Sequence, residues 1–401
     1  MTLAEVLRRE GGQVLATLIR MTGDIGMAED ALQEATVAAF ERWSDDSMPD
    51  NPGAWLTTTA RNKALDRLRR ESRRNEKERE AVRLLDQQLG EPNEPTDLLR
   101  LLFTCCHPTL AAESQVALAL RTLCGLTTPE IASLFLVQDA TMGQRISRAK
   151  KKISMARIPY RVPEDHELPD RLPPVLATLY LVFTTGHHAP SGALDSRLDL
   201  ADEAIRLTRM LTSLMPDEPE ATGLLALMLA THARRRARVG PDGSLVLLAD
   251  QDRDRWDHDM IREASDLVEG SLRRRGPAEY RLQAAIACLH GLAPSYEETD
   301  WPQIAELYRL LESVRPTPVV RVNRAVAEAE ASGPRRGLEL MRDVTGVDGW
   351  HLYWATLADF HRRLDDPESA AEAYRRALEC SMNRADRAFL TGRLAEVAGG
   401  G

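Results

Sequence analysis

The sequence lacks the features that would place it in a membrane or hold it together with disulfides. No apolar run approaches the roughly twenty residues of a membrane-spanning helix, and the longest lies around Leu224–Ala230. The first residues, MTLAEVLRRE, contain acids and no apolar signal-peptide core. The five cysteines form no CxxC pair, which argues against a disulfide framework. We therefore expect a cytoplasmic protein without contact to a membrane.

The common motifs of enzymes and metal sites are also missing. There is no glycine-rich phosphate loop, no serine nucleophile elbow and no HExxH. We considered three segments as metal sites: Cys105-Cys106-His107, His187-His188 and the acidic run 250–257. Vicinal thiols chelate one ion poorly, the histidine pair has no matched carboxylate nearby, and the acidic run lacks the glycine and closing glutamate of a calcium loop. We expect no enzyme activity, no metal and no cofactor, and we expect the acids to pair with nearby arginines or to cap a helix.

Lysine is absent after Lys152, and the chain divides by charge. Residues 1–160 hold 22 basic and 22 acidic residues, whereas residues 161–401 contain no lysine and carry the whole net charge of −9. Clustered basic charge is typical of nucleic-acid binders even when the total is acidic. The first part is therefore the place to look for such binding.

Runs of β-branched residues are scarce, and Leu, Ala, Glu and Arg dominate, which predicts an all-α fold. Asp242-Gly243 is the exception and predicts one small β-hairpin. Segments 318–341 and 349–379 resemble each other, with turn residues 33 positions apart, close to the 34-residue period of tetratricopeptide repeats. We expect helical modules at 1–89 and 97–160, a linker at 90–96, and a repeat-like helical domain at 170–401.

A helix-turn-helix is predicted at 126–153, LTTPEIASLFLVQDATMGQRISRAKKKI. Thr128 is expected to cap the first helix and Asp139 the second. The second helix would bury Met142, Ile146 and Ala149. Its exposed face would present polar and basic side chains suited to base edges and phosphates, namely Thr141, Gln144, Arg145, Arg148, Lys151 and Lys152.

Two further segments precede it. Residues 61–83 hold ten basic and five acidic residues, next to an aromatic ring and hydroxyls, a mixture that suits single-stranded or melted DNA. The helix expected at 30–43, DALQEATVAAFERW, has an acidic and amide face with Phe40 and Trp43, which could dock on a protein.

The three segments in this order resemble the sigma-70 family of RNA polymerase sigma factors, specifically the extracytoplasmic-function (ECF) group. AEDALQEATVAAFERW resembles the helix that docks on polymerase, NPGAWLTTTARNKALDRLRR the helix that melts and reads the −10 element, and 126–153 the helix-turn-helix that reads the −35 element. The rest of the chain resembles a subgroup with a tetratricopeptide-like extension.

The resemblance implies binding to promoter DNA and to core RNA polymerase, through its β′ clamp helices and β flap. The implied polymerase contacts are Asp30, Gln33, Glu34 and Trp43. The implied −10 contacts are Trp55, Thr58, Arg61, Asn62, Arg67 and Arg70. The implied −35 contacts are Thr141, Gln144, Arg145, Arg148 and Lys151. Turn 44–51 would capture a flipped base, and linker 86–97 would thread the polymerase cleft.

Two other functions remain open from the residues alone. A one-component regulator would need only the helix-turn-helix and a sensing repeat domain, which leaves the pattern at 27–83 unexplained. A repeat scaffold would use its concave face to bind proteins. We further expect the extension to modulate activity, by contact with residues 1–160 or with an unknown protein.

Overall fold

The computed structural model describes residues 2–43, 48–71, 95–135, 137–187, 194–238, 240, 246–275, 278–381 and 384–399. Within these ranges the chain is α-helical and contains no strand, which confirms the predicted fold class. It divides into two compact units, residues 1–207 and 208–401. The predicted Asp242-Gly243 hairpin turn, residues 44–47 of the turn 44–51, most of the linker 86–97 and residues 72–89 of the module expected at 1–89 lie outside the described residues.

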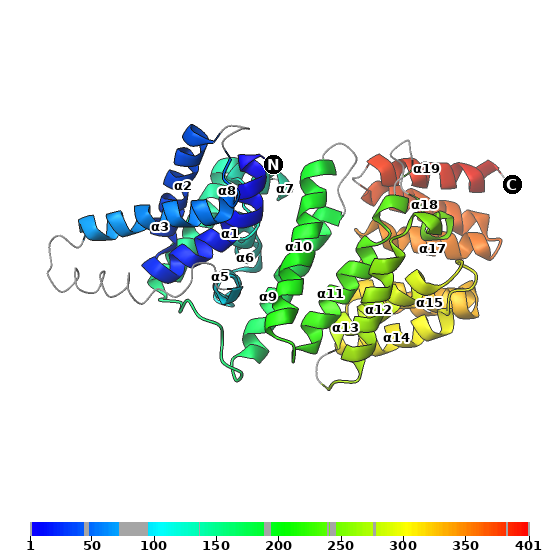
Figure 1. Cartoon of the computed structure of the whole chain (residues 1–401). Coiled ribbons are helices and arrows are strands. Elements are labelled where there is room, and N and C mark those ends of the chain that lie inside the picture. Colours follow the sequence, from blue (N-terminus) through cyan, green and yellow to red (C-terminus); the bar gives the residue numbers. More distant parts are fainter. Residues whose placement is uncertain are drawn as a thin grey trace. The chain divides into compact units, whose positions relative to one another are not determined.

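The first unit begins with a bundle of three helices that all pack on one another (Figure 1). These are α1 (Leu3–Thr22), α2 (Ile25–Arg42) and α3 (Pro52–Glu71). The start of α1 is fixed by Thr2, whose side chain accepts from the amide of Glu5 in a capping box. Its end is fixed by Gly23, which adopts the left-handed φ of 67° that favours glycine. Both signals are local, so the sequence itself fixes the two ends of α1.

The remaining helices of this unit include the helix-turn-helix. They are α5 (Pro95–Cys105), α6 (Ala112–Thr122), α7 (Thr128–Leu134), α8 (Asp139–Met155) and α9 (Leu168–His187), with α10 (Leu194–Leu214) running across the division between the units. α9 packs on α5 and α6, and Arg171 at its start donates to the Phe103 carbonyl at 3.1 Å. The segment after the helix-turn-helix is therefore part of the same compact unit.

The second unit starts with α11 (Pro219–His232), which packs against both α12 (His258–Leu272) and α13 (Glu279–Leu292). Between α11 and α12 lie short 3-10 turns, η2 (Arg235–Ala237), η3 (Leu248–Asp250) and η4 (Arg253–Arg255). The predicted capping role of the acidic run is confirmed for Asp257, which accepts from the amide of Met260 at 3.0 Å and starts α12. Asp252 in turn accepts from the amide of Asp254 and starts η4.

Antiparallel helix pairs make up the rest of the second unit. They are α14 (Trp301–Val314), α15 (Pro318–Ser332), α16 (Pro334–Met341), α17 (His351–Arg363), α18 (Pro367–Cys380) and α19 (Arg384–Gly399). Each cluster of buried apolar residues spans neighbouring helices rather than one central core, as in stacked helical repeats. The turn at Gly333 and the cap at Asp366, which suggested the repeat, begin α16 and α18.

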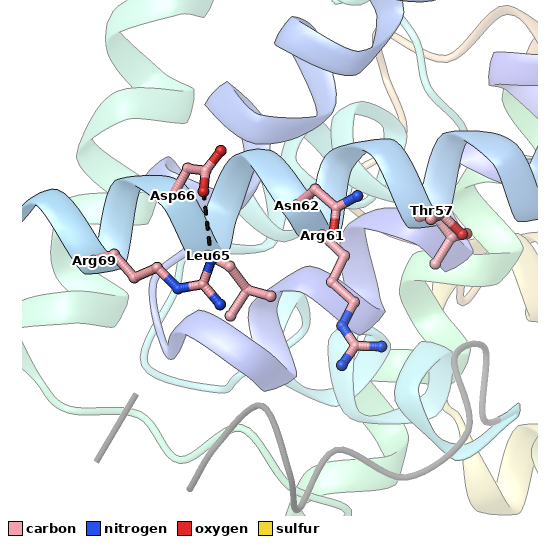
Figure 2. Close-up of a pocket in the computed structure, with 7 residues that line it drawn as sticks. Thr57, Arg61, Asn62, Leu65, Asp66 and Arg69 are labelled. Atoms are coloured by element: carbon pink, nitrogen blue, oxygen red, sulfur yellow. Dashed lines mark ion pairs between the residues drawn. The ribbon is translucent and has the colours of Figure 1, made fainter. Parts of the chain in front are cut away.

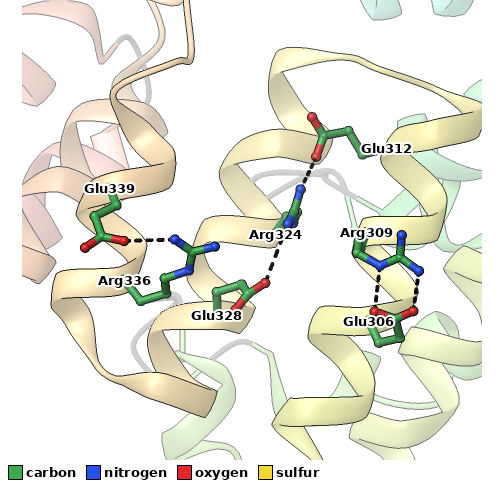
Figure 3. Close-up of polar contacts among 7 residues, drawn as sticks. All are labelled: Glu306, Arg309, Glu312, Arg324, Glu328, Arg336 and Glu339. Atoms are coloured by element: carbon green, nitrogen blue, oxygen red, sulfur yellow. Dashed lines mark hydrogen bonds and ion pairs between the residues drawn. The ribbon is translucent and has the colours of Figure 1, made fainter.

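Ion pairs join successive helices of these repeats on their surface (Figure 3). Arg324 of α15 reaches Glu312 of α14 at 2.9 Å and Glu328 of its own helix at 3.7 Å. Two further pairs are local to one helix, Glu306 with Arg309 and Arg336 with Glu339. The two exposed pairs within single helices contribute at most about 1 kcal/mol each, and the apolar clusters pack neighbouring helices together.

Candidate nucleic-acid interface

A polar groove runs along α3, opposite the face that packs in the bundle. Asn51 caps this helix by accepting from the amide of Ala54 at 3.0 Å, and Pro52 is the first helical residue. Leu56, Ala60 and Ala64 are fully buried against the bundle. The groove has a volume of about 480 Å³ and is lined by Thr57, Thr58, Arg61, Asn62, Leu65, Asp66 and Arg69 (Figure 2).

Three of the residues predicted to line −10 DNA therefore share one groove, Thr58, Arg61 and Asn62. The side chains of Arg61 and Arg69 extend to the same side of α3 (Figure 2). Arg69 lies 3.7 Å from Asp66, an exposed pair that solvent screens. Hydroxyl, amide and guanidinium donors in one open groove are suited to the phosphates and base edges of an unpaired strand.

The other −10 candidates lie elsewhere on the helix. Arg67 is half-buried and donates to Asp30 of α2 at 2.6 Å, with Glu34 at 3.8 Å. Trp55 packs edge-to-face against Trp43, with ring centroids 5.2 Å apart. Both contacts join residues predicted for DNA to residues predicted for polymerase. These contacts between α2 and α3, here called the α2–α3 seam, thus lie between the expected DNA surface and the expected polymerase surface. Arg70 is exposed near the end of α3.

The outer face of α2 carries both charge and exposed apolar surface. Ala31, Ala35 and Ala39 are buried, and their small side chains let α2 lie close to its neighbours. On the opposite face Asp30 and Gln33 are exposed. Val37 is 52% exposed and Phe40 78% exposed, and an uncovered apolar pair among acids and amides is typical of a protein-docking face. Val37 was not selected from the sequence, although its helical spacing from Gln33 and Phe40 was a usable signal.

The helix-turn-helix is formed by α7 and α8, with two corrections at the caps. Thr127, not Thr128, caps α7. Its side chain accepts from the amide of Glu130, and its own amide donates to the Glu130 carboxylate at 2.7 Å. α8 begins at Asp139, so this residue is not its cap; Gln138 holds the cap position without a side-chain bond. The predicted buried face is confirmed, because Met142, Ile146 and Ala149 are at most 5% exposed.

The face of α8 directed away from the bundle carries most of the predicted −35 contacts. Thr141, Gln144, Arg148 and Lys151 are exposed, as is Lys152. Arg145 differs, because it is half-buried, pairs with Glu113 of α6 at 3.0 Å and lies over the Phe135 ring at 5.6 Å. The exposed set therefore follows one helical face, and Arg145 is turned toward the module itself.

Comparison with known proteins fits this geometry. Residues 6–74 match the family Sigma-70 region 2, and residues 100–153 match Sigma-70, region 4. The chain is 30% identical over 146 residues to the ECF RNA polymerase sigma factor SigL of Mycobacterium tuberculosis (strain ATCC 25618 / H37Rv), a match that covers 34% of this chain and 78% of SigL. The chain belongs to the ECF group of the sigma-70 family.

The sigma factor continues beyond region 4 into an extension. Residues 171–272 match a family of unknown function (DUF6596). The whole chain is 39% identical over 395 residues to an uncharacterized protein of Rhizobium meliloti (strain 1021), covering 96% of this chain and 93% of that protein. No helix in the described part of the chain is long and apolar enough to cross a membrane.

Regions 2 and 4 of the sigma factor contact each other within the first unit. Lys150 lies on α8 beside the exposed −35 face, but it pairs with Glu29 of α2. Arg20 of α1 bonds the buried carboxylate of Asp97 at 2.8 Å. A Cβ added to Gly12 of α1 would lie 2.8 Å from the Leu123 carbonyl, so glycine permits this close approach of α1 to the end of α6.

The vicinal cysteines of the sigma factor are buried and unreactive. Cys105, Cys106 and Cys124 are each at most 4% exposed. Burial raises the pKa of the Cys105 thiol to about 12 and raises that of Cys106 as well. Burial therefore disfavours the thiolate form of both side chains. Within the described ranges no group of three metal-ligating side chains comes together.

Proposed function

We propose that this sigma factor directs core RNA polymerase to specific promoters, and that the exposed face of α8 reads the −35 element. The observation that carries the proposal is this face: Thr141, Gln144, Arg148 and Lys151 are exposed on the second helix of a helix-turn-helix that lies within the region 4 match. Such a helix presents its first turns to base edges and its later cations to phosphates.

The groove on α3 is our candidate for the −10 element. It gathers Thr58, Arg61 and Asn62 with Arg69, and it lies within the region 2 match. Arg67 and Trp55 would support this surface from the α2–α3 seam, and Arg70 would extend it. Sequence preference would come from capture of unpaired bases and from groove readout, without covalent chemistry.

The outer face of α2 is our candidate for docking on polymerase, at the β′ clamp helices, with region 4 on the β flap. Asp30, Gln33 and Glu34 supply polar contacts, and Val37 and Phe40 supply apolar surface that desolvation makes favourable. Trp43 packs on Trp55. Polymerase bound at Trp43 would therefore also fix the ring beside the −10 groove.

Transcription by purified core polymerase tests this function. The full chain should stimulate initiation at a promoter found by sequencing the DNA that it binds in cells. Arg148→Ala together with Gln144→Ala should abolish this stimulation while co-purification with polymerase persists. Phe40→Ala with Val37→Ala should lose co-purification with polymerase, and should therefore lose the stimulation as well. Absence of stimulation on every genomic template would refute the proposal.

We further propose that the extension modulates the sigma factor. Residues 161–401 carry the net charge of −9, so they can compete with DNA for the basic side chains of residues 1–160 at low salt. A chain cut at residue 160 would lose α9, which packs on α5 and α6; a chain ending at Leu207 keeps the whole first unit. If the extension masks the DNA-binding side chains, the chain ending at Leu207 should bind promoter DNA more tightly than the full chain at low salt. Equal DNA affinity of the two chains would contradict masking. Loss of transcription by the shorter chain would instead show that the extension is required.

A further inference from the structure

A cluster of cationic side chains surrounds one indole ring in the extension. Trp256 is only 4% exposed. The guanidinium carbon of Arg253 lies 4.4 Å from the centroid of its ring, and that of Arg234 lies 5.8 Å from it. The cluster is held in place by the backbone, because the amide of Asp257 donates to the carbonyl of Ala233 at 3.0 Å.

Several buried donors in this cluster have no acceptor. The Nε of Arg234, the Nη2 of Arg253 and the Nε1 of Trp256 are shielded from solvent and have no hydrogen-bond partner in the described part of the chain. A buried donor that is left unsatisfied destabilises the fold, and a charged one does so more strongly. Three such donors around one ring therefore call for an acceptor.

The charges in this cluster also favour a bound acceptor. Among the described residues neither Arg234 nor Arg253 forms an ion pair, so of the two roles expected for the acids at 250–257 the structure shows helix capping and not pairing with these two arginines. Burial and the neighbouring Arg238 and Arg253 lower the pKa of Arg234 to about 10. Glu297, which is exposed, is the acid that acts on Arg253. A partly desolvated pair of like charges is costly unless an anion joins it.

Arg253 also has a structural task that Arg234 lacks. Its Nη1 donates to the carbonyls of His290 and Ala293 at 2.9 and 2.7 Å. These two hydrogen bonds cap the C-terminal end of α13, where a cation is favourable. Arg234 makes no such bond through its side chain within the described ranges. Helix capping thus satisfies one nitrogen of the Arg253 guanidinium and explains nothing about the position of Arg234.

We propose that Arg234, Arg253 and Trp256 form an anion-binding site in the extension whose ligand carries a phosphate group. Guanidinium groups bind phosphate oxygens through paired, charge-assisted hydrogen bonds, and the indole N–H adds a third donor. A tetrahedral dianion has enough acceptor oxygens for all of these donors and enough charge to balance both guanidiniums. A carboxylate offers two oxygens and one charge and would leave the second cation uncompensated.

Titration calorimetry of the full chain with inorganic phosphate, at constant ionic strength, tests the site. We expect one saturable binding event that Arg234→Gln and Arg253→Gln each weaken by about tenfold or more. Arg236→Gln and Arg255→Gln are matched controls, because both residues are exposed and lie in the same two short turns; they should bind phosphate as the unaltered chain does.

A further variant protects the test against loss of folding. Arg253→Gln also removes the α13 cap, so Trp256→Phe, which keeps a smaller aromatic ring and lacks the N–H donor, should weaken phosphate binding in a chain that still unfolds cooperatively on heating. Phosphoserine or adenosine monophosphate should compete with inorganic phosphate, and the tighter of them identifies the source of the group. Competition by acetate at equal concentration, absence of saturable binding, or unchanged binding in Arg234→Gln and Trp256→Phe would overturn the proposal.

Discussion

Arg67 of α3 donates to Asp30 of α2 at 2.6 Å, which ties a predicted DNA contact to a predicted polymerase contact. The side chains are 35% and 56% exposed, so solvent screens the pair. Such a pair contributes at most about 1 kcal/mol to stability. Its importance is positional, because it orients Arg67 toward α2 and leaves Arg61 as the arginine from the −10 set that lines the groove.

This geometry predicts different results for the two arginines. Arg61→Ala should weaken binding of single-stranded −10 DNA by about tenfold, the usual worth of one positioned cation in a DNA site. Arg67→Ala should weaken it by less and should reduce polymerase affinity as well, because it releases Asp30. Fluorescence anisotropy with a labelled oligonucleotide and a polymerase pull-down measure both, and Arg9→Ala, at an exposed site on α1, is the control. Equal DNA losses in Arg61→Ala and Arg67→Ala, with polymerase binding intact, would contradict this assignment.

Local patterns sufficed for elements whose ends carry their own signals. The span of α1 follows from Thr2 and Gly23, and the buried face of α8 follows from helical spacing. The cap of α7 was misassigned between two adjacent threonines, although Glu130 lies three residues after Thr127 and forms the capping box that decides between them.

Contacts between residues far apart in sequence were beyond such patterns. Arg67 meets Asp30 across 37 positions, and Arg20 meets Asp97 across 77. A helical wheel does not predict which of two basic side chains on a helix will form an ion pair with a residue of another helix. The same holds for Arg234 and Arg253, whose nearby acids cap helices rather than pair with them. The sequence therefore predicts which helices carry the expected DNA and polymerase surfaces, whereas tertiary packing determines which of their side chains stay exposed.

Lys150 and Lys151 are adjacent on α8, and they should differ in their effect on DNA. Lys151 is exposed, so Lys151→Met should weaken −35 binding and reduce the slope of log affinity against log salt by about one, the loss of one phosphate contact. Lys150 pairs with Glu29 of α2, so Lys150→Met should leave that slope unchanged and loosen the contact between regions 2 and 4. Binding measured across a salt series decides this, and identical slopes for both variants would contradict it.

Gly143 lies inside α8, where glycine costs about 1 kcal/mol relative to alanine. A Cβ built there meets only the Cγ2 of Thr128, at an ordinary 3.8 Å. Gly143→Ala should therefore raise the free energy of unfolding by about 0.5–1 kcal/mol and leave −35 affinity unchanged. Gly12→Ala is the opposite control, because its Cβ would meet the Leu123 carbonyl at 2.8 Å and should destabilise the chain. Urea unfolding measures both, and weaker DNA binding by Gly143→Ala would show that the backbone there approaches DNA closely.

His290 should make the extension sensitive to mild acid. Burial, with Arg234 and Arg253 nearby, lowers the pKa of its imidazole from 6.5 to about 4, and its ring packs edge-to-face on Trp301 with centroids 5.1 Å apart. The folded chain therefore takes up this proton less readily than the unfolded chain. The stabilising contribution is complete above pH 6.5 and is lost as the pH falls from 6.5 to 4, by at most on the order of 3 kcal/mol. Urea unfolding in phosphate-free buffer should show this loss, His290→Phe should remove most of it while keeping a ring against Trp301, and His166→Gln, at an exposed site, should not. Parallel pH profiles for the unaltered chain and His290→Phe would show that this histidine is not the source.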